Sequence, residues 1–293
     1  MLFYKEPFSR KLFVIINYFF LGMIALLCIF PMIHVLAVSL SSNAQVSAGA
    51  VIAWPREFQL DTYKFVVGNP QFYTAFGISV ERTLLGIIVN MLLTVLAAYP
   101  LSLSRRKFKE RGFYVWFFLI TILFSGGLIP GFLIVKYTGL LDSIWALIIP
   151  GAVPVFNVIL LQNFFKELPV EISESAHIDG MGHWTILFRI MIPLAKPAIA
   201  TLVLFVAVFH WNSWFDGILY MNRAEHYPLQ SYLQTIVVQV DIRTATNLKS
   251  IKNISQQNSK AAQIIVAMLP ILVVYPFLQK HFTKGIVLGS VKG

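Results

Sequence analysis

The sequence predicts an all-α membrane protein with six transmembrane helices, and three observations support this fold class. Of the 293 residues, 57% are hydrophobic and only 12% are charged, whereas soluble domains carry about 25% charged residues. Mean hydropathy is +0.73, which leaves too few charges for a water-exposed surface and too much apolar surface for a disordered chain. The apolar residues also form continuous runs of helix length, and not the alternating pattern of membrane strands.

Six segments are long enough to cross a bilayer core, which takes about 20 apolar residues in a helix. In chain order they are residues 12–40, 75–103, 112–135, 143–165, 198–220 and 261–278. The first run is much longer than the apolar part of a signal peptide, which has about 7–15 residues. We therefore expect residues 1–293 to form a single transmembrane domain.

The basic residues predict the orientation, because Lys and Arg are enriched in cytoplasmic loops. If the N-terminus is inside, most of the 23 basic residues fall on the inner side. The densest group is Arg105–Arg111, between the second and third segments. We expect both termini to be cytoplasmic. The net charge of +10 then describes a membrane face that attracts anionic lipid, and it does not indicate nucleic-acid binding.

Two sites depart from a regular apolar helix. Gly127 and Gly131 have the spacing of a helix-packing motif, but Pro130 lies between them, so a broken or kinked helix at an outer vestibule is the stronger expectation. Glu81 and Arg82 stand together at the outer mouth of the second segment. We expect them to form a local ion pair or to reach toward the interface.

The main functional signal lies in the loop of residues 166–197, which the orientation places in the cytoplasm. Pro169 suits the start of a helix and Gly180 suits its end, which predicts a short helix over about 169–179. A second apolar segment, 184–192, follows and ends before a proline. The pattern is two short helices joined by a glycine corner, and taken alone it also fits an ordinary interfacial loop.

The residue pattern of this loop resembles the EAA signature of permease subunits in ABC importers. The matching residues are Glu174, Ser175, Ala176, Asp179, Gly180, Ile190 and Pro193. Ser175 stands where the signature has a second alanine, and Ile192 stands where it has leucine. The segments 124–130, 140–147, 163–165 and 284–293 further resemble permeases for polysaccharides and complex oligosaccharides. Within that branch, the chain is most similar to the smaller permease of alginate-type importers.

This resemblance implies a type I ABC importer permease fold and a mechanism. The helix that carries Glu174 would sit in a groove of a cytoplasmic ATPase, with Glu174 and Asp179 as polar anchors and Gly180 as a hinge. Small Ala176 would allow a close approach by the other protein. The implied partners are a second, homologous permease, two ATPase subunits that bind ATP and Mg, and a periplasmic or extracellular solute-binding protein. The implied location is a bacterial inner membrane.

Polar and aromatic residues inside the expected spans are candidates for the substrate path, because sugars are held by aromatic faces and polar side chains, and amides that face lipid are costly. The candidates are Asn90, Asn157, His210, Trp211, Asn212 and Trp214. For Trp214 and Asp216 the competing interpretation is an aromatic belt at the membrane interface.

Motif searches exclude several other functions. The chain contains no Gly-Lys pair and thus no P-loop, so any ATP must be bound by another subunit. No zinc-enzyme motif or nucleophile elbow is present, and Cys28 is the single cysteine. We expect no catalytic site, metal or cofactor on this chain. A permease for a neutral oligosaccharide or lipopeptide-like ligand remains an alternative, as does an ATP-independent transporter, which would require intramembrane carboxylates or an internal repeat.

Overall fold

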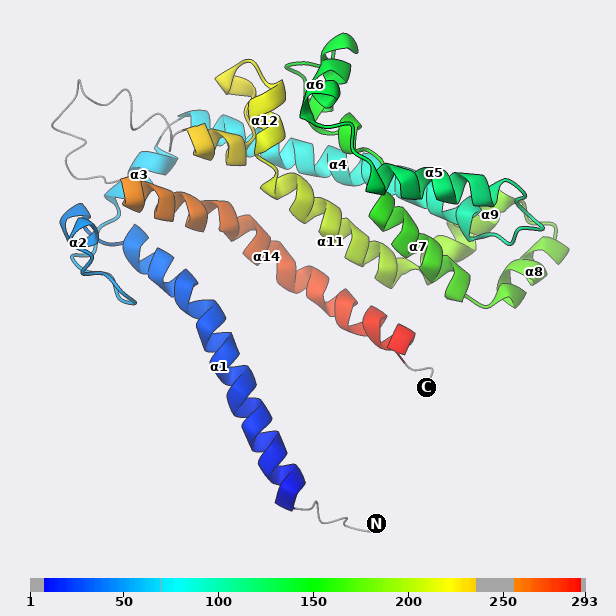
Figure 1. The fold of residues 1–293 in the computed structure, drawn as a ribbon, viewed down its shortest axis with the longest axis horizontal. Coiled ribbons are helices and arrows are strands. Elements are labelled where there is room, and N and C mark those ends of the chain that lie inside the picture. Colours follow the sequence, from blue (N-terminus) through cyan, green and yellow to red (C-terminus); the bar gives the residue numbers. More distant parts are fainter. Residues whose placement is uncertain (1–7, 69, 236–255, 291–293) are drawn as a thin grey trace. The chain divides into compact units, whose positions relative to one another are not determined.

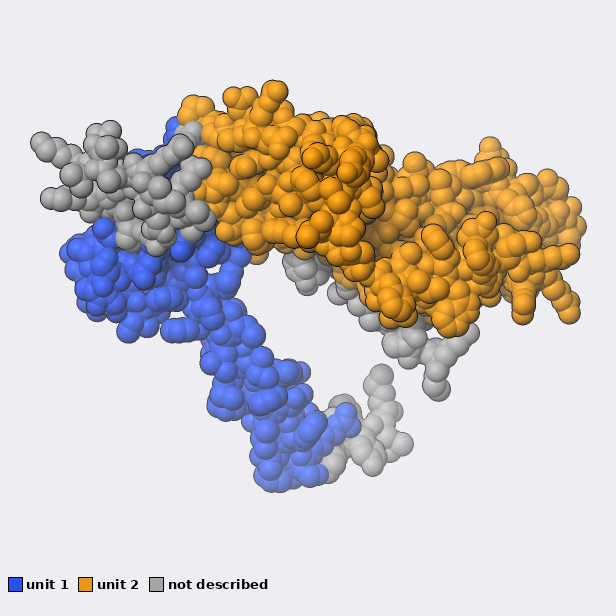
Figure 2. Space-filling model, turned by 45° about the horizontal axis from the view of Figure 1, so that its top comes forward, with its two compact units in different colours: residues 1–69, 236–268 blue, residues 70–235, 269–293 orange. Residues whose placement is uncertain are grey.

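The structure is a computed structural model that describes residues 8–68, 70–235 and 256–290. Within these ranges the regular elements are all helical, as the sequence predicts. The chain divides into two compact units (Figure 2). One unit contains residues 1–69 and 236–268, and the other contains residues 70–235 and 269–293.

The first unit is built on α1 (Phe8–Ser39), with the short helices α2 (Asn43–Ser47) and α3 (Asp61–Val67) after it. The first part of α14 (Gln256–Ser290) also belongs to this unit. Asn258 of α14 is fully buried and donates hydrogen bonds to the carbonyl oxygens of Ser41 (2.6 Å) and Val38 (3.4 Å). These bonds tie the start of α14 to the end of α1 (Figure 1).

The core of the second unit lies around α4 (Pro70–Ser102), which packs against α7 (Val155–Glu167) and α11 (Lys196–Asn212). The centre of this core consists of apolar side chains that are almost completely buried, among them Ala98, Val158, Leu161, Ile186 and Leu202. Figure 1 shows α7 and α11 running beside α4. The outward side of α4 carries exposed apolar residues such as Leu84 and Ile88, as expected for a helix that meets lipid or another membrane subunit.

Only two helices, α1 and α4, are continuous and apolar enough to cross a membrane by themselves among the described residues. Three further spans qualify if two helices separated by a bend are counted together. The first such pair is α5 (Arg111–Leu123) with α6 (Leu128–Tyr137), bent by 115°. The expected break near Pro130 is present and lies between Leu123 and Leu128, so the expected segment 112–135 consists of the two helices α5 and α6.

The second bent pair consists of the 3-10 turns η1 (Ile144–Leu147) and η2 (Ile149–Gly151) with α7, at 50°. The expected segment 143–165 is thus regular α-helix only in its second half.

The third pair joins residues 183–194 to α11 at 82°. The expected segment 198–220 is also interrupted, since α11 ends at Asn212 and α12 (Phe215–Tyr220) follows as a separate helix, with the turn η4 (Ala224–His226) after it. The sixth expected segment, 261–278, is helical as part of α14.

Candidate functional site

The segment with the EAA-like residues folds as the sequence predicts. The helix α8 (Val170–Ile178) begins directly after Pro169. Its end is closed by Gly180, whose φ of +77° suits a residue without a side chain. The N–H of Gly180 donates to the carbonyl of His177 (3.0 Å), and the N–H of Met181 donates to that of Ala176 (2.9 Å). These two bonds satisfy carbonyl groups that the end of a helix leaves free.

The EAA-like residues divide into an exposed group and a buried group. Glu174, Ser175, Asp179 and Gly180 are exposed in the chain. Ala176 is only 3% exposed and packs into the same core as α4 and α7. Its small side chain therefore allows close packing within this chain, and the expectation that it offers a surface to another protein is wrong. Of the other two residues, Ile190 is partly buried against that core and Pro193 is exposed.

The connection from α8 to α11 is bent and irregular. It consists of α9 (His183–Ile186), the π-helical segment η3 (Leu187–Met191) and α10 (Ile192–Leu194). Ile186 and Leu187 are buried in the core. The helix α8 and this connection therefore pack into the same core as α4, α7 and α11.

Three residues that sequence reasoning missed also hold this region together. The hydroxyl of Tyr99, near the end of α4, lies 3.2 Å from Nδ1 of His183. The ring of His183 in turn contacts that of His177 on α8, with a centroid distance of 5.1 Å. No periodicity or motif in the sequence indicates this contact, because the three residues come from separate elements.

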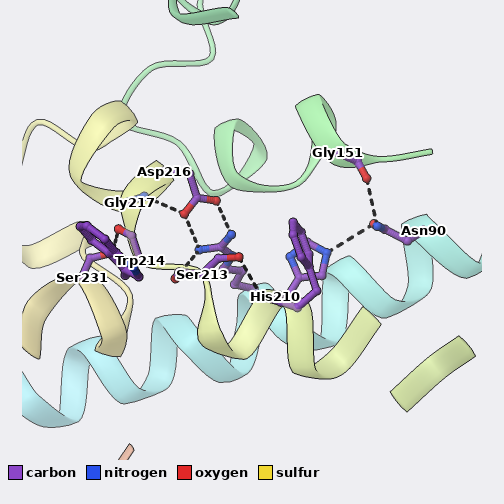
Figure 3. A network of polar contacts seen from close by, with 10 residues as sticks. Asn90, Gly151, His210, Ser213, Trp214, Asp216, Gly217 and Ser231 are labelled. Atoms are coloured by element: carbon purple, nitrogen blue, oxygen red, sulfur yellow. Dashed lines mark hydrogen bonds and ion pairs between the residues drawn. The ribbon is translucent and has the colours of Figure 1, made fainter. Parts of the chain in front are cut away.

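A second polar site joins α4 to the break between α11 and α12 (Figure 3). The guanidinium of Arg82 is completely buried and forms a two-point ion pair with Asp216, with 3.1 Å between Nη1 and Oδ1. Nη1 also donates to the carbonyl oxygen of Ser213 (3.2 Å). The expected pairing of Arg82 with Glu81 is therefore wrong, since Glu81 is exposed and the cation points into the unit.

A side chain of α4 also forms a hydrogen bond with the backbone at the break before α7. The amide nitrogen of Asn90 donates to the carbonyl oxygen of Gly151 (3.0 Å), and its oxygen lies 3.5 Å from Nε2 of His210. Asn90 and His210 are each 1% exposed. Gly86 permits this approach, because a Cβ there would lie 2.3 Å from a carbon of the His210 ring.

This geometry changes the list of residues expected along a substrate path. Asn90 and His210 are buried and serve the internal packing of the chain, so they do not line an open surface. Asn157 is also buried, and Trp211 borders an apolar cavity of about 210 Å³ between α4, α11 and α14, with its ring 5.8 Å from that of Phe76. Asn212 and Trp214 are exposed, and for these two the assignment stays a prediction.

No group of three metal-ligating side chains occurs in the described part of the chain. The two sites described above are built from packing, helix ends and one ion pair. They position helices of the second unit relative to one another.

Residues 3–287 match the family model of the binding-protein-dependent transport system inner membrane component. The chain belongs to this family. It is thus a permease component of a binding-protein-dependent ABC transporter, and this class of subunit forms part of a membrane pathway and is not the catalytic subunit. The all-helical fold and the apolar spans agree with a multi-pass membrane protein.

Relatives of this permease cover almost its whole length. It is 44% identical over 97% of its length to the polygalacturonan/rhamnogalacturonan transport system permease protein YtcP of Bacillus subtilis, of which it covers 100%. It is 42% identical to Protein LplC of the same organism, over 97% of this chain and 96% of the relative.

A solved structure also resembles this permease. It is a chain of a bacterial ABC transporter involved in the import of the acidic polysaccharide alginate. The TM-score is 0.84 at 32% identity, and the match covers 94% of this chain and 99% of that one. The fold expected from the sequence is therefore that of the solved relative.

Proposed function

We propose that this permease forms half of the translocation path of an importer for acidic oligo- or polysaccharides. The observation that carries the proposal is the similarity to the alginate importer over nearly the whole chain. The relative named for polygalacturonan, which is also a polymer of sugar acids, supports the same substrate class. The other half of the path would come from a second, homologous permease, and a solute-binding protein would deliver the sugar. The importer would lie in a bacterial inner membrane, with both termini of this chain in the cytoplasm.

The energy for transport would come from separate ATPase subunits that bind ATP and Mg. We propose α8 as the contact to the ATPase, because Glu174 and Ser175 on the helix and Asp179 directly after it are exposed, while Ala176 anchors the helix in the core. An exposed polar face combined with a buried apolar face suits a joint that passes a displacement from one subunit to another. Ile190 and Pro193 would support the joint from the segment that leads to α11.

Uptake by cells tests the substrate class. A strain without this permease should lose uptake of labelled oligogalacturonides or alginate oligosaccharides, and the wild-type gene should restore it. Uptake of maltodextrin in the same strain is the control, because a maltodextrin permease of Bacillus subtilis is 29% identical to this chain. Loss of maltodextrin uptake alone would favour the second candidate, a permease for neutral oligosaccharides.

Purification tests the energy source separately. An ATPase and a second permease should accompany the tagged chain in detergent, and transport in vesicles should require ATP. Transport that continues in vesicles without any ATPase would contradict the proposal and favour an ATP-independent transporter.

A further inference from the structure

A cavity of about 610 Å³ lies in the second unit, between the segment that follows α4 and one side of α8. Its volume falls within the range of about 300–1,000 Å³ that is typical of sites for small ligands. The cavity is distinct from the polar site around Arg82, which belongs to another part of α4. The charges and the apolar side chains of its walls determine which ligand it would accept.

One wall of the cavity is strongly basic. Arg105, Arg106 and Lys107 contribute three consecutive cations, and Lys166 at the end of α7 adds a fourth. Glu174 is the single carboxylate among the lining residues. No ion pair described in the structure involves any of the four cations. Positive charge without a neutralising partner favours an anionic ligand.

The other part of the cavity is apolar. Leu103 lines it from the segment after α4, Phe165 and Leu168 line it from α7 and its end, and Leu194 lines it from α10. A free inorganic anion gains nothing from such a surface, because the hydrophobic contribution to binding requires an apolar group on the ligand. The combination of cations and apolar side chains therefore selects an amphipathic anion.

The cavity lies where two membrane helices end. The helix α4 ends at Ser102 and α7 ends at Glu167, and both positions belong to the lining or stand directly beside it. Basic pockets next to the cytoplasmic ends of transmembrane helices are suited to the headgroups of anionic lipids. We propose that this cavity binds the phosphate headgroup of an anionic phospholipid, with the start of an acyl chain on Phe165 and Leu168.

The opposite wall of the cavity is formed by α8, through Ser173, Glu174 and His177. A bound lipid therefore contacts the helix that we propose as the joint with the ATPase. Any effect of the lipid on transport rests on that proposed function. Binding of the lipid does not, because it requires only the cavity and its charges.

Lipid binding to the full chain, purified in detergent with the subunits that accompany it, tests the proposal. Phosphatidylglycerol and phosphatidylcholine are titrated separately, and the lipid bound to this chain is counted by native mass spectrometry. We expect preferential binding of one phosphatidylglycerol. The double variant Arg106→Gln/Lys166→Gln should weaken its binding about tenfold or more, because each cation near an anionic headgroup contributes substantially to binding.

A second double variant, Lys109→Gln/Arg189→Gln, is the matched control. It removes the same charge from exposed positions that do not line the cavity, so it should change the affinity for phosphatidylglycerol less than twofold. Equal weakening by both double variants would reduce the effect to general surface charge and overturn the site. Glycerol 3-phosphate and inorganic phosphate, which carry the phosphate without an acyl chain, are added as soluble competitors of phosphatidylglycerol. Competition by either one at concentrations near that of the lipid would overturn the requirement for an apolar chain.

Discussion

Arg82 and Asp216 form an ion pair between α4 and the first turn of α12, with the arginine side chain completely buried and the aspartate side chain 27% exposed. The same guanidinium donates to the carbonyl of Ser213, at the point where α11 has ended. A buried cation without a partner is strongly destabilising. The pair therefore fixes the position of α12 on α4, and it does so only while both residues are present.

Replacement of one partner tests this role. We expect Asp216→Ala to lower the free energy of unfolding by about 2–4 kcal/mol, toward the lower end of the range for buried pairs because the aspartate is partly exposed. Thermal unfolding of the chain in detergent measures the change. The double variant Arg82→Met/Asp216→Ala removes the unpaired charge and should recover part of the loss. A double variant that is less stable than Asp216→Ala would contradict the role of the buried charge.

Two glycines of α4 provide a matched comparison. Gly86→Ala places a Cβ 2.3 Å from the His210 ring, and we expect a loss of about 1–3 kcal/mol, as for other overpacked sites. Gly77→Ala on the same helix meets no atom within 4 Å, so the higher helix propensity of alanine should leave stability unchanged or raise it by up to about 1 kcal/mol. Chemical unfolding of both variants gives the comparison, and equal effects would argue against the close contact with His210.

Substitutions on α8 separate coupling from packing. We expect Glu174→Lys to abolish sugar uptake while the chain remains in the membrane at a normal level, because Glu174 is exposed and its replacement leaves the core intact. Gly180→Pro should act in the same way, since proline cannot adopt the φ of +77° at the corner. Uptake and membrane content are measured in the same cells. Normal uptake by both variants would refute the proposed joint.

Ala176→Leu is the contrasting variant on the same helix. Ala176 is buried in the core, so a larger side chain should lower stability by about 1–3 kcal/mol. The amount of folded chain in the membrane should fall together with uptake. If uptake falls while the thermal stability in detergent is unchanged, Ala176 contacts another subunit and not the core.

Asp142 holds the segment after α12, and its charge makes this contact sensitive to pH. Burial by itself raises the pKa of the Asp142 carboxyl, but the bond to His226 (2.9 Å) and the N–H groups of Asn222 and Arg223 outweigh it and hold the pKa below its usual range. The stabilisation is therefore complete above about pH 4 and is lost as the pH falls further, through the lowered pKa of the folded state.

Hydrogen exchange of residues 221–227 measures this contact. We expect Asp142→Asn to speed exchange there at pH 7, because the amide keeps the backbone shape at φ +60° but lacks the charge. Glu225→Gln, at an exposed position of the same segment, is the control and should leave the exchange unchanged. Equal exchange in both variants would show that the charge of Asp142 does not hold the segment.

Local signals in the sequence predicted the helical class, most of the helices and the short helix α8 with its glycine corner. These features depend on neighbouring residues, namely apolar run length, a proline at a helix start and a glycine at a helix end. The signals were weaker inside the spans. Ser125, Gly126 and Gly127 mark one break and Asn212 and Ser213 mark the other, but a few small or polar residues inside a long apolar run do not show where or how sharply the helix bends.

The partners of polar residues were decided only by the tertiary structure. Arg82 stands next to Glu81 in the sequence but pairs with Asp216, 134 residues away, because a buried guanidinium must find a charge inside the unit and not beside it in the chain. Asn90 and His210 are residue types that are common in sugar sites. In the structure, the Asn90 amide donates to a backbone carbonyl at the break before α7, and its oxygen lies 3.5 Å from the His210 ring. Ala176 has the size of a contact residue for another protein, yet it fills the core of its own chain. The sequence alone determined which residues are apolar, where helices form and which family signature they carry. Which side chains face one another was decided by packing, because contacts between distant segments depend on how whole helices are placed.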